Sequence, residues 1–354
     1  MTPPEVGYRM IDSFEIKRYR CFSSISVSEL SRINIIVGQS GSGKTALLEA
    51  LWLCAGGNPQ HYFNVLGWRG VIGTQLRLDT ETYDQFFRDM FYRFHTDKGI
   101  EMRLEDSERG TWQLEIGPDQ DVGQQSLDVP VTMTHTAISF VSKSPSKESF
   151  KVPIQFGPTG EIQFPRSPNP YQVVMLNSMT LAMPGTTTNR FSQMVQDGEE
   201  SKIISGLNKL YRNITDLRLI TYAGGNVLLA SVDGLGRIPI SSVSGGVNKY
   251  LTLLITLGHK RKNVVLLDEF ENGFYYANLT DVWRGIINVC RETDSQLFLT
   301  THSQECLQAL LPVLQESPQD FTLIRTERQE GETLPVRFSG EEMLASLKQE
   351  FELR

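Results

Sequence analysis

The chain has 354 residues, of which 40% are hydrophobic and 21% charged, a composition typical of a globular protein larger than a minimal domain. Its net charge of −7 gives no overall electrostatic footprint for nucleic acid, and no apolar run approaches the roughly eighteen residues that span a bilayer. The four cysteines lack metal-binding spacing and the N-terminus shows no signal-peptide pattern, so we expect a cytoplasmic protein with reduced thiols.

The first predicted element is a phosphate-binding loop between a strand and a helix. The β-branched run 33–37 is typical of a buried parallel strand, and residues 46–52 are mostly good helix formers. Between them the pattern G-x-x-x-x-G-K-[ST] is matched by Gly38, Gln39, Ser40, Gly41, Ser42, Gly43, Lys44 and Thr45. Such a loop aims backbone N–H groups at the phosphates of ATP, with Lys44 reaching the β- and γ-phosphates and Thr45 binding Mg²⁺. The alternative is a glycine-rich turn that merely connects two elements, but such a turn would not need the buried strand before it and the helix after it.

The middle of the chain predicts a compact mixture of helix and strand. Residues 81–94 predict one short helix with an aromatic-rich face, which serves either as core packing or as a groove for a partner. Residues 100–104 and 111–116 flank a turn and predict a hairpin, and 129–141 and 149–156 predict further strands. A proline-rich stretch of loops follows, and there are no sustained heptads of the kind that build a long coiled coil.

A serine and two glycines, Ser244, Gly245 and Gly246, precede the apolar segment 250–257. Backbone N–H groups at such a helix start form a second anion-binding terminus, although a plain turn would also explain these three residues. The segment is separate from the phosphate loop, so one chain cannot obviously use both on one ATP. Two chains packed head to tail can.

The apolar strand 264–267 ends in two carboxylates, Asp268 and Glu269. In phosphate-loop ATPases the first such carboxylate supports Mg²⁺, and a second one directly after it is placed to polarise the attacking water. A solvated strand end is the alternative. The next segment predicts a helix that covers the sheet with an apolar face made of Leu279, Val282, Trp283, Ile286, Ile287 and Cys290.

The strand 296–301 leads to His302, at the edge of a parallel sheet where ligands of open α/β folds bind. The imidazole would sense the γ-phosphate or orient the water, unless it is an ordinary surface histidine. We expect the three strands that precede Lys44, Asp268 and His302 to be neighbours. These side chains should then converge at the carboxyl edge of one largely parallel sheet.

The end of the chain predicts a helix at 304–314, a hairpin of 321–325 with 334–338, and a helix at 341–353. These elements are enough to close an ATPase sheet. They are not enough for a nuclease of ordinary domain size.

Taken in order, the phosphate loop, Ser-Gly-Gly, Asp-Glu and strand-Thr-His resemble the head of an ABC-type ATPase. The group it resembles contains RecF, SMC proteins, double-strand-break repair ATPases and the OLD family. Many OLD-like proteins carry a Toprim nuclease, which the expected end of this chain leaves no room for. The resemblance implies an α/β P-loop NTPase with a mostly parallel sheet and a β-rich insertion. Its parts would be an ATPase lobe at 1–57, a family-specific insertion at 58–170, and the rest of the lobe at 171–354.

The resemblance also implies roles for individual residues. The opening 11–22 resembles the group's first strand and aromatic-Arg turn, which would lay Arg20 against the nucleotide phosphates. Ser244, Gly245 and Gly246 would be the signature segment that touches the partner chain's γ-phosphate. Their neighbours Val243 and Val247 depart from the Leu and Gln of transporters. The metal-sensing glutamine is left open among Gln60, Gln75 and Gln172.

Three functions agree with this resemblance. The favoured one is a dimerising ATPase, a homodimer or higher oligomer that uses ATP and Mg²⁺ to control a nearby-encoded effector, a nuclease or toxin, in antiphage defence. The second is a RecF-like DNA repair ATPase, for which a basic strip around Arg69, Arg77, Arg88 and Arg93 would contact DNA. The third is a structural scaffold whose ATP turns over very slowly. No membrane partner is implied.

Overall fold

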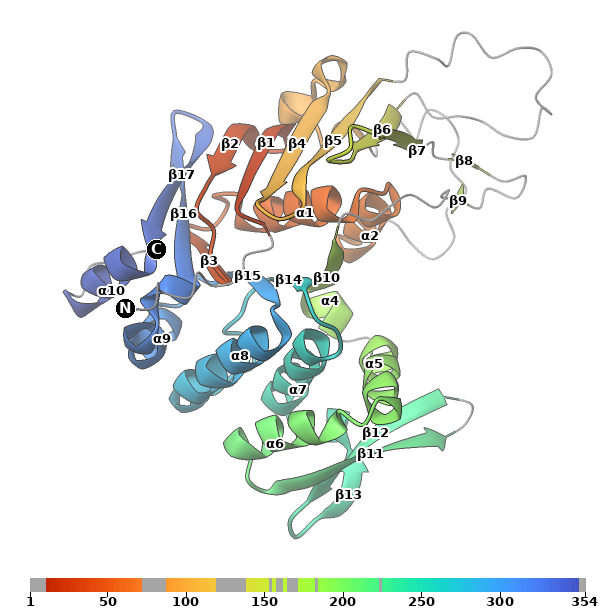
Figure 1. The fold of residues 1–354 in the computed structure, drawn as a ribbon, viewed down its shortest axis with the longest axis vertical. Helices are drawn as coiled ribbons and strands as arrows, with labels where there is room; N and C mark the ends of the chain where they lie inside the picture. Colours follow the sequence, from red (N-terminus) through yellow and green to blue (C-terminus); the bar gives the residue numbers. More distant parts are fainter. Residues whose placement is uncertain are drawn as a thin grey trace.

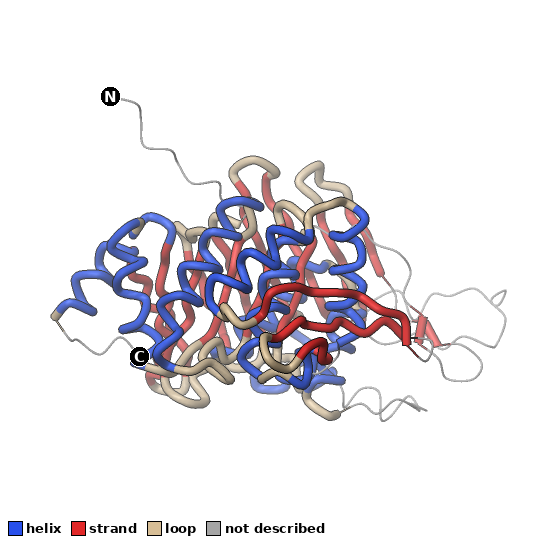
Figure 2. Tube along the Cα trace, turned by 90° about the horizontal axis from the view of Figure 1, so that it is seen from below, coloured by secondary structure: helices blue, strands red, loops and turns tan. Residues whose placement is uncertain are grey.

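The computed structural model describes residues 11–71, 87–118, 138–152, 155–156, 162–163, 171–181, 184–222 and 225–349. Two six-stranded sheets form the body of the molecule, with helix α1 (Lys44–Gly56) between them. In the view of Figure 1 one sheet lies above α1 and the other below it, and they are called the upper and the lower sheet. Three helices cover the face of the lower sheet that points away from α1: α7 (Gly245–Gly258), α8 (Leu279–Thr293) and α9 (Gln304–Glu316). Figure 2 looks at the molecule from the side of these helices.

The lower sheet is the predicted, largely parallel one. Its strand order is β10-β14-β15-β3-β16-β17, with bounds Gln172–Leu176, Asn263–Leu267, Gln296–Thr300, Ile33–Gly38, Phe321–Gln329 and Glu332–Ser339. The first five strands are parallel, and β17 returns antiparallel to β16. The predicted neighbourhood of the strands before Lys44, Asp268 and His302 is therefore confirmed, as is the C-terminal hairpin.

The central strands β14, β15 and β3 are buried on both faces, which explains their continuous apolar runs. In β3, Ile33, Ile35 and Val37 belong to the core formed with α7, α8 and α9, whereas Ile36 faces the core around α1. Strand β14 divides in the same way, with Val265 on one side and Leu266 on the other. The predicted face of α8 is also confirmed, because all six of its residues are buried.

The upper sheet is antiparallel in the order β2-β1-β4-β5-β6-β7. Its strands are Phe22–Val27, Ser13–Tyr19, Ile100–Asp106, Gly110–Pro118, Ile138–Lys143 and Ser149–Val152. The hairpin expected at 100–116 is confirmed as β4 and β5. Because β4 pairs with β1, the middle of the chain extends a sheet that the N-terminal strands begin. A short pair, β8 (Gln155–Phe156) with β9 (Ile162–Gln163), follows.

The remaining described elements surround these sheets. Helix α2 (Gln60–Trp68) packs on α1, and a three-stranded sheet lies beyond α5 and α6 (Figure 1). The list of bounds is α4 Ser178–Leu181, α5 Pro184–Gln196, α6 Glu200–Leu210, β11 Ile214–Tyr222, β12 Gly225–Val232, β13 Gly236–Pro239 and α10 Gly340–Lys348. No helix among the described residues is long and apolar enough to cross a membrane.

The predicted helix at 81–94 is wrong at its end. Residues 87–88 are helical, but the chain then turns, and Phe91 forms an antiparallel bridge with Tyr19 of β1. A 3₁₀ turn follows at Tyr92–Phe94, where Arg93 and Phe94 have positive φ values of 51° and 62°. Phe94 is 54% exposed, so it does not share a buried face with Phe87. Residues 81–86 lie outside the described part, as do residues 129–137 of the strand expected at 129–141, whose last residues belong to β6.

Candidate nucleotide site

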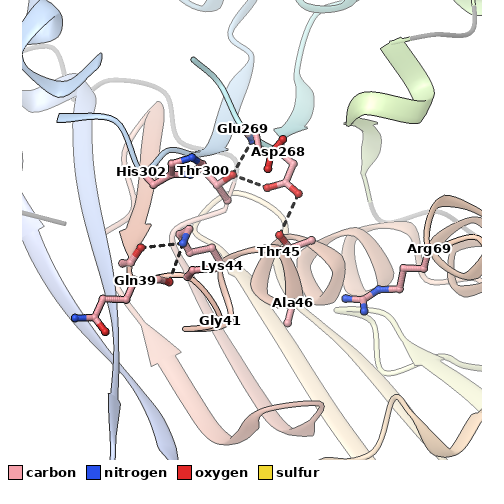
Figure 3. Close-up of a pocket in the computed structure, with 13 residues that line it drawn as sticks. Gln39, Gly41, Lys44, Thr45, Ala46, Arg69, Asp268, Glu269, Thr300 and His302 are labelled. Carbon is pink, nitrogen blue, oxygen red and sulfur yellow. Dashed lines mark hydrogen bonds between the residues drawn. The ribbon is translucent and has the colours of Figure 1, made fainter. Parts of the chain in front are cut away.

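A cavity of about 730 Å³ lies at the carboxyl edge of the parallel sheet (Figure 3). It is lined by Gly38, Gln39, Ser40, Gly41, Gly43, Lys44, Thr45, Ala46, Arg69, Asp268, Glu269, Thr300 and His302. The phosphate loop, the two carboxylates and the histidine, which come from three separate strands, therefore meet in one place. Its size is within the range of small-molecule sites.

The loop between β3 and α1 has the backbone of a phosphate cradle. Gly38 and Gly43 have φ values of 144° and 99°, in a region that other residues avoid. A Cβ on Gly38 would lie 2.5 Å from the carbonyl oxygen of Thr326, so only glycine fits there. Helix α1 has no side-chain cap and no acidic residue in its first turn, which leaves its N–H groups for an anion.

The Lys44 ammonium lies in the mouth of this loop. It donates hydrogen bonds to the carbonyl oxygens of Gly38 and Gln39, at 2.8 and 2.9 Å. Burial lowers the pKa of Lys44, and the nearby Asp268 carboxylate acts in the opposite direction. Ser42, also predicted as a ligand, is 3% exposed, and its hydroxyl lies 2.6 Å from that of Thr326 beneath the loop rather than along the cavity.

Asp268 is held by two hydroxyl groups. Thr45 Oγ1 donates to one carboxylate oxygen at 3.0 Å, and Thr300 Oγ1 donates to the other at 2.5 Å. Oxygen donors of this kind suit Mg²⁺, which usually takes one or two protein ligands and completes its shell with phosphates and water. Among the described residues, no group of three His, Cys, Asp or Glu side chains is placed to enclose a metal ion.

Glu269 follows with a left-handed backbone, at a φ of 54°. Its N–H donates to Thr300 Oγ1 at 2.9 Å, and its carboxylate accepts a 2.7 Å hydrogen bond from the Asn272 amide. His302 is linked to the same loop, because Glu271 accepts from its backbone N–H at 3.1 Å and lies 3.5 Å from its Nδ1 atom. The sequence analysis assigned no role to Glu271 or Thr300, although Glu271 lies two residues after Glu269 and Thr300 lies on the strand before His302.

Arg20, which the resemblance places against the nucleotide phosphates, is not among the residues that line this cavity. Its Nε atom lies 2.9 Å from the carboxylate of Glu49, a residue of α1 that is 3% exposed. The same carboxylate accepts two hydrogen bonds from Arg69, at 2.7 and 3.0 Å. Arg69 lines the cavity, so the Glu49 carboxylate connects Arg20 to a residue of the cavity wall. The sequence analysis names Arg69 as part of a basic strip for DNA, whereas in the structure its side chain lines the cavity.

The segment Ser244-Gly245-Gly246 also lies outside the cavity. Ser244 is the N-cap of α7, and its hydroxyl accepts from the Val247 N–H at 3.2 Å. Ser244 and Gly245 are exposed, whereas Gly246 is buried against the loop after β14. A Cβ on Gly246 would lie 2.6 Å from the carbonyl oxygen of Gly273. The start of α7 is therefore exposed at Ser244 and Gly245 and closed against the loop after β14 at Gly246.

Comparisons with known families support an ATPase. Residues 13–159 match the model of an AAA domain. Residues 175–307 match a second model, described as "AAA domain, putative AbiEii toxin, Type IV TA system". Between them these matches cover the phosphate loop and the strand ends that carry Asp268 and His302.

Individual relatives point the same way. The chain is 25% identical over 376 residues to an ATP/GTP phosphatase of Helicobacter pylori, covering 95% of this chain and 100% of that protein. It is 45% identical over 62 residues to the DNA replication and repair protein RecF of Idiomarina loihiensis, 18% of this chain and 17% of RecF.

Two solved structures share the fold. One is an SMC head bound to the C-terminal winged-helix domain of ScpA, with a TM-score of 0.54, 15% identity and coverage of 94% and 99% of the two chains. The other is an SMC head with an extended coiled coil, bound to the C-terminal domain of ScpA derived from Pyrococcus furiosus. Its TM-score is 0.51, at 13% identity and coverage of 96% and 99%. At these identities the likeness concerns the fold alone.

Proposed function

Since the chain is an ATPase of the RecF- and SMC-like ABC type, we propose that it is a nucleotide-driven clamp that controls a partner effector in antiphage defence. Two copies close on ATP, and hydrolysis loosens them. The effector is a nuclease or toxin that responds to this movement.

The cavity residues suit hydrolysis of the γ-phosphate. Lys44 and the N–H groups of its loop bind the phosphates, and Thr45 and Asp268 would hold Mg²⁺, which neutralises charge on them. Water attacks the γ-phosphorus while the bond to the bridging oxygen of ADP breaks. Glu269 orients the water and takes its proton, and His302, which lines the same cavity, contacts the γ-phosphate.

The observation that carries the clamp is the position of the signature segment, Ser244-Gly245-Gly246. It is the start of a 14-residue helix, exposed at Ser244 and Gly245, and it does not line the cavity of its own chain. A helix start favours an anion through the N–H groups of its first turn and through its dipole. A second chain brings such an anion when its bound ATP is presented to this surface.

The effector and its biological setting are supported by a weaker observation. The family model that matches residues 175–307 carries the description of a putative AbiEii toxin of a type IV toxin–antitoxin system. RecF-like DNA repair is the second candidate, and the 62-residue match to RecF favours it. A scaffold with very slow turnover is the third.

Phage plating tests the defence role. The chain is expressed with the genes that flank it in a phage-sensitive bacterium, and plaques are counted. We expect fewer plaques with the wild type and full recovery with Lys44→Ala, because that variant lacks the phosphate clamp. Lys202→Ala, which changes an exposed lysine of α6 paired with Glu199, is the control and should protect like the wild type.

The alternatives give different results in the same strains. DNA repair predicts two different results. Plaque counts should not depend on Lys44, and the chain should restore the survival of a recombination-deficient host after ultraviolet damage. Both results together would favour DNA repair over defence. Protection that persists in Glu269→Gln without measurable turnover would favour the scaffold.

A further inference from the structure

The loop that carries Glu269 is held by a lysine of α7. Lys249 lies in the second turn of that helix and is 6% exposed. Its ammonium donates hydrogen bonds to the carbonyl oxygens of Glu269 and Asn272, at 2.7 and 2.9 Å. The same ammonium lies 5.4 Å from the centre of the Phe274 ring. All three partners belong to the loop that follows β14.

A lysine at this position needs an explanation beyond stability. Buried ammonium groups are rare, since desolvation opposes the charge, and an apolar side chain of similar length would fill the space without that penalty. Burial here lowers the pKa of Lys249 to about 8, while Glu271 and Glu269 act in the opposite direction. Its direct hydrogen-bond partners are main-chain carbonyl groups, so what Lys249 fixes is the path of the backbone.

That path is unusual at Glu269. A φ of 54° is a left-handed conformation that residues other than glycine take only when their surroundings impose it. The N–H of Glu269 is bound by Thr300 and its carbonyl by Lys249, so the residue is fixed on both sides. Loss of the ammonium would release the carbonyls of Glu269 and of Asn272, whose amide holds the Glu269 carboxylate, so the carboxylate would lose its defined direction.

Helix α7 contacts this loop at a second point. Gly246, in its first turn, packs so closely on the Gly273 carbonyl that a Cβ would lie 2.6 Å from the oxygen. Gly246 and Lys249 are one turn apart, and both are buried. The exposed start of α7 is therefore mechanically joined to the loop of Glu269 in the same chain.

We propose that Lys249 is a positioning residue for ATP hydrolysis. It locks the Glu269 loop to α7, so that the carboxylate is in place only while α7 keeps its position. This inference rests on the role proposed above for Glu269. In a clamp, this link between α7 and the Glu269 loop makes hydrolysis in the cavity of one chain respond to contacts at the start of α7, at Ser244, in that same chain.

Steady-state kinetics of Lys249→Met test the proposal. We expect kcat to fall at least about tenfold while KM and the affinity for ATP stay within about threefold, because the phosphate loop is untouched. Lys249→Arg, which keeps charged donors, should recover part of kcat. Lys202→Met, at an exposed lysine, is the matched control and should keep the wild-type kcat. A Lys249→Met protein with wild-type kcat would overturn the proposal.

The Glu269→Gln background separates positioning from general damage. If Lys249 acts through Glu269, Lys249→Met should lower the residual rate of Glu269→Gln by less than about twofold, since effects within one functional unit are not additive. An equal relative loss in both backgrounds would mean a merely structural role. Failure of the proposed function is distinguishable, because Glu269→Gln alone would then hydrolyse ATP like the wild type.

Circular dichroism establishes whether Lys249→Met folds. If it does not, Lys249→Gln is measured instead, since its amide can still donate to one of the two carbonyls. Hydrogen–deuterium exchange should be faster in peptides covering 269–274 and unchanged at 38–45. Unchanged exchange at 269–274 with unchanged kcat would count against Lys249 as a positioning residue.

Discussion

At the scale of single residues, the cavity separates binding from chemistry. Lys44 already lies against two carbonyl groups of the phosphate loop, so Lys44→Ala should lose ATP binding and turnover together. Glu269→Gln keeps the size of the side chain and an oxygen that can accept from Asn272, but it cannot take a proton. We expect it to bind ATP normally and to hydrolyse it about 10²-fold more slowly.

Phosphate release and titration calorimetry measure the two properties separately. Glu292→Gln, at an exposed position of α8, is the control and should keep the wild-type rate. If Glu269→Gln hydrolysed ATP at the wild-type rate, Glu269 would not be the general base. If Lys44→Ala still bound ATP tightly, Lys44 would not be a phosphate ligand.

The residues that could be predicted from sequence are those at fixed positions after a strand. Lys44, Asp268 and His302 each follow an apolar run, and parallel strands bring their carboxyl ends to one edge. Arg69 and Lys249 could not be predicted in the same way. Arg69 is held at the cavity wall by the buried Glu49 carboxylate of α1, and Lys249 binds main-chain carbonyls that only the folded Glu269 loop presents.

At the scale of elements, the contact between α1 and α2 contains His61, a histidine whose pKa is lowered by burial. The His61 ring lies 4.4 Å from the ring centre of Trp52 and against Gly56 of α1, and burial lowers its pKa to about 4. In the unfolded chain the pKa returns to about 6.5. Between these values the unfolded state takes up a proton that the folded state does not, so this contribution to stability falls as the pH drops from 6.5 to 4.

Urea unfolding at several pH values measures this effect. The contribution should decrease by up to about 1.4 kcal/mol per pH unit within that window, and it should be absent in His61→Phe. His95→Phe, at a position 58% exposed, is the control and should follow the wild type. Parallel pH curves for the wild type and His61→Phe would mean that His61 takes up its proton over the same pH range in the folded and unfolded states.

Whole elements were predictable where the signal is local. The periodicity of α8 and the hairpin β4–β5 are repeated in the structure, because each pattern reports one buried face or one turn. The end of the helix predicted at 81–94 was not, because Phe91 pairs with Tyr19, which lies far away in sequence. The pairing of β4 with β1 was also out of reach, since strand pairing across such distances has no local signature.

At the scale of the whole molecule, the nucleotide cavity and the exposed start of α7 are separate surfaces of one chain. If both act on the same ATP, two chains must meet. A Glu269→Gln protein, which binds ATP but hydrolyses it slowly, should therefore dimerise or tighten an existing dimer with ATP and Mg²⁺. Light scattering with and without nucleotide measures this association.

Ser244→Arg should abolish that association while leaving ATP binding by a single chain largely intact. The long side chain would cover the N–H groups at the exposed start of α7, and the cavity of the same chain would be unaffected because Ser244 does not line it. The substitution also removes an N-cap, which costs helix stability about 1 kcal/mol. Ser339→Arg is the matched control, because it removes the N-cap of α10, and it should still associate. Loss of association in both variants would assign the effect to helix stability, and unchanged association in Ser244→Arg would sink the shared site and favour the scaffold.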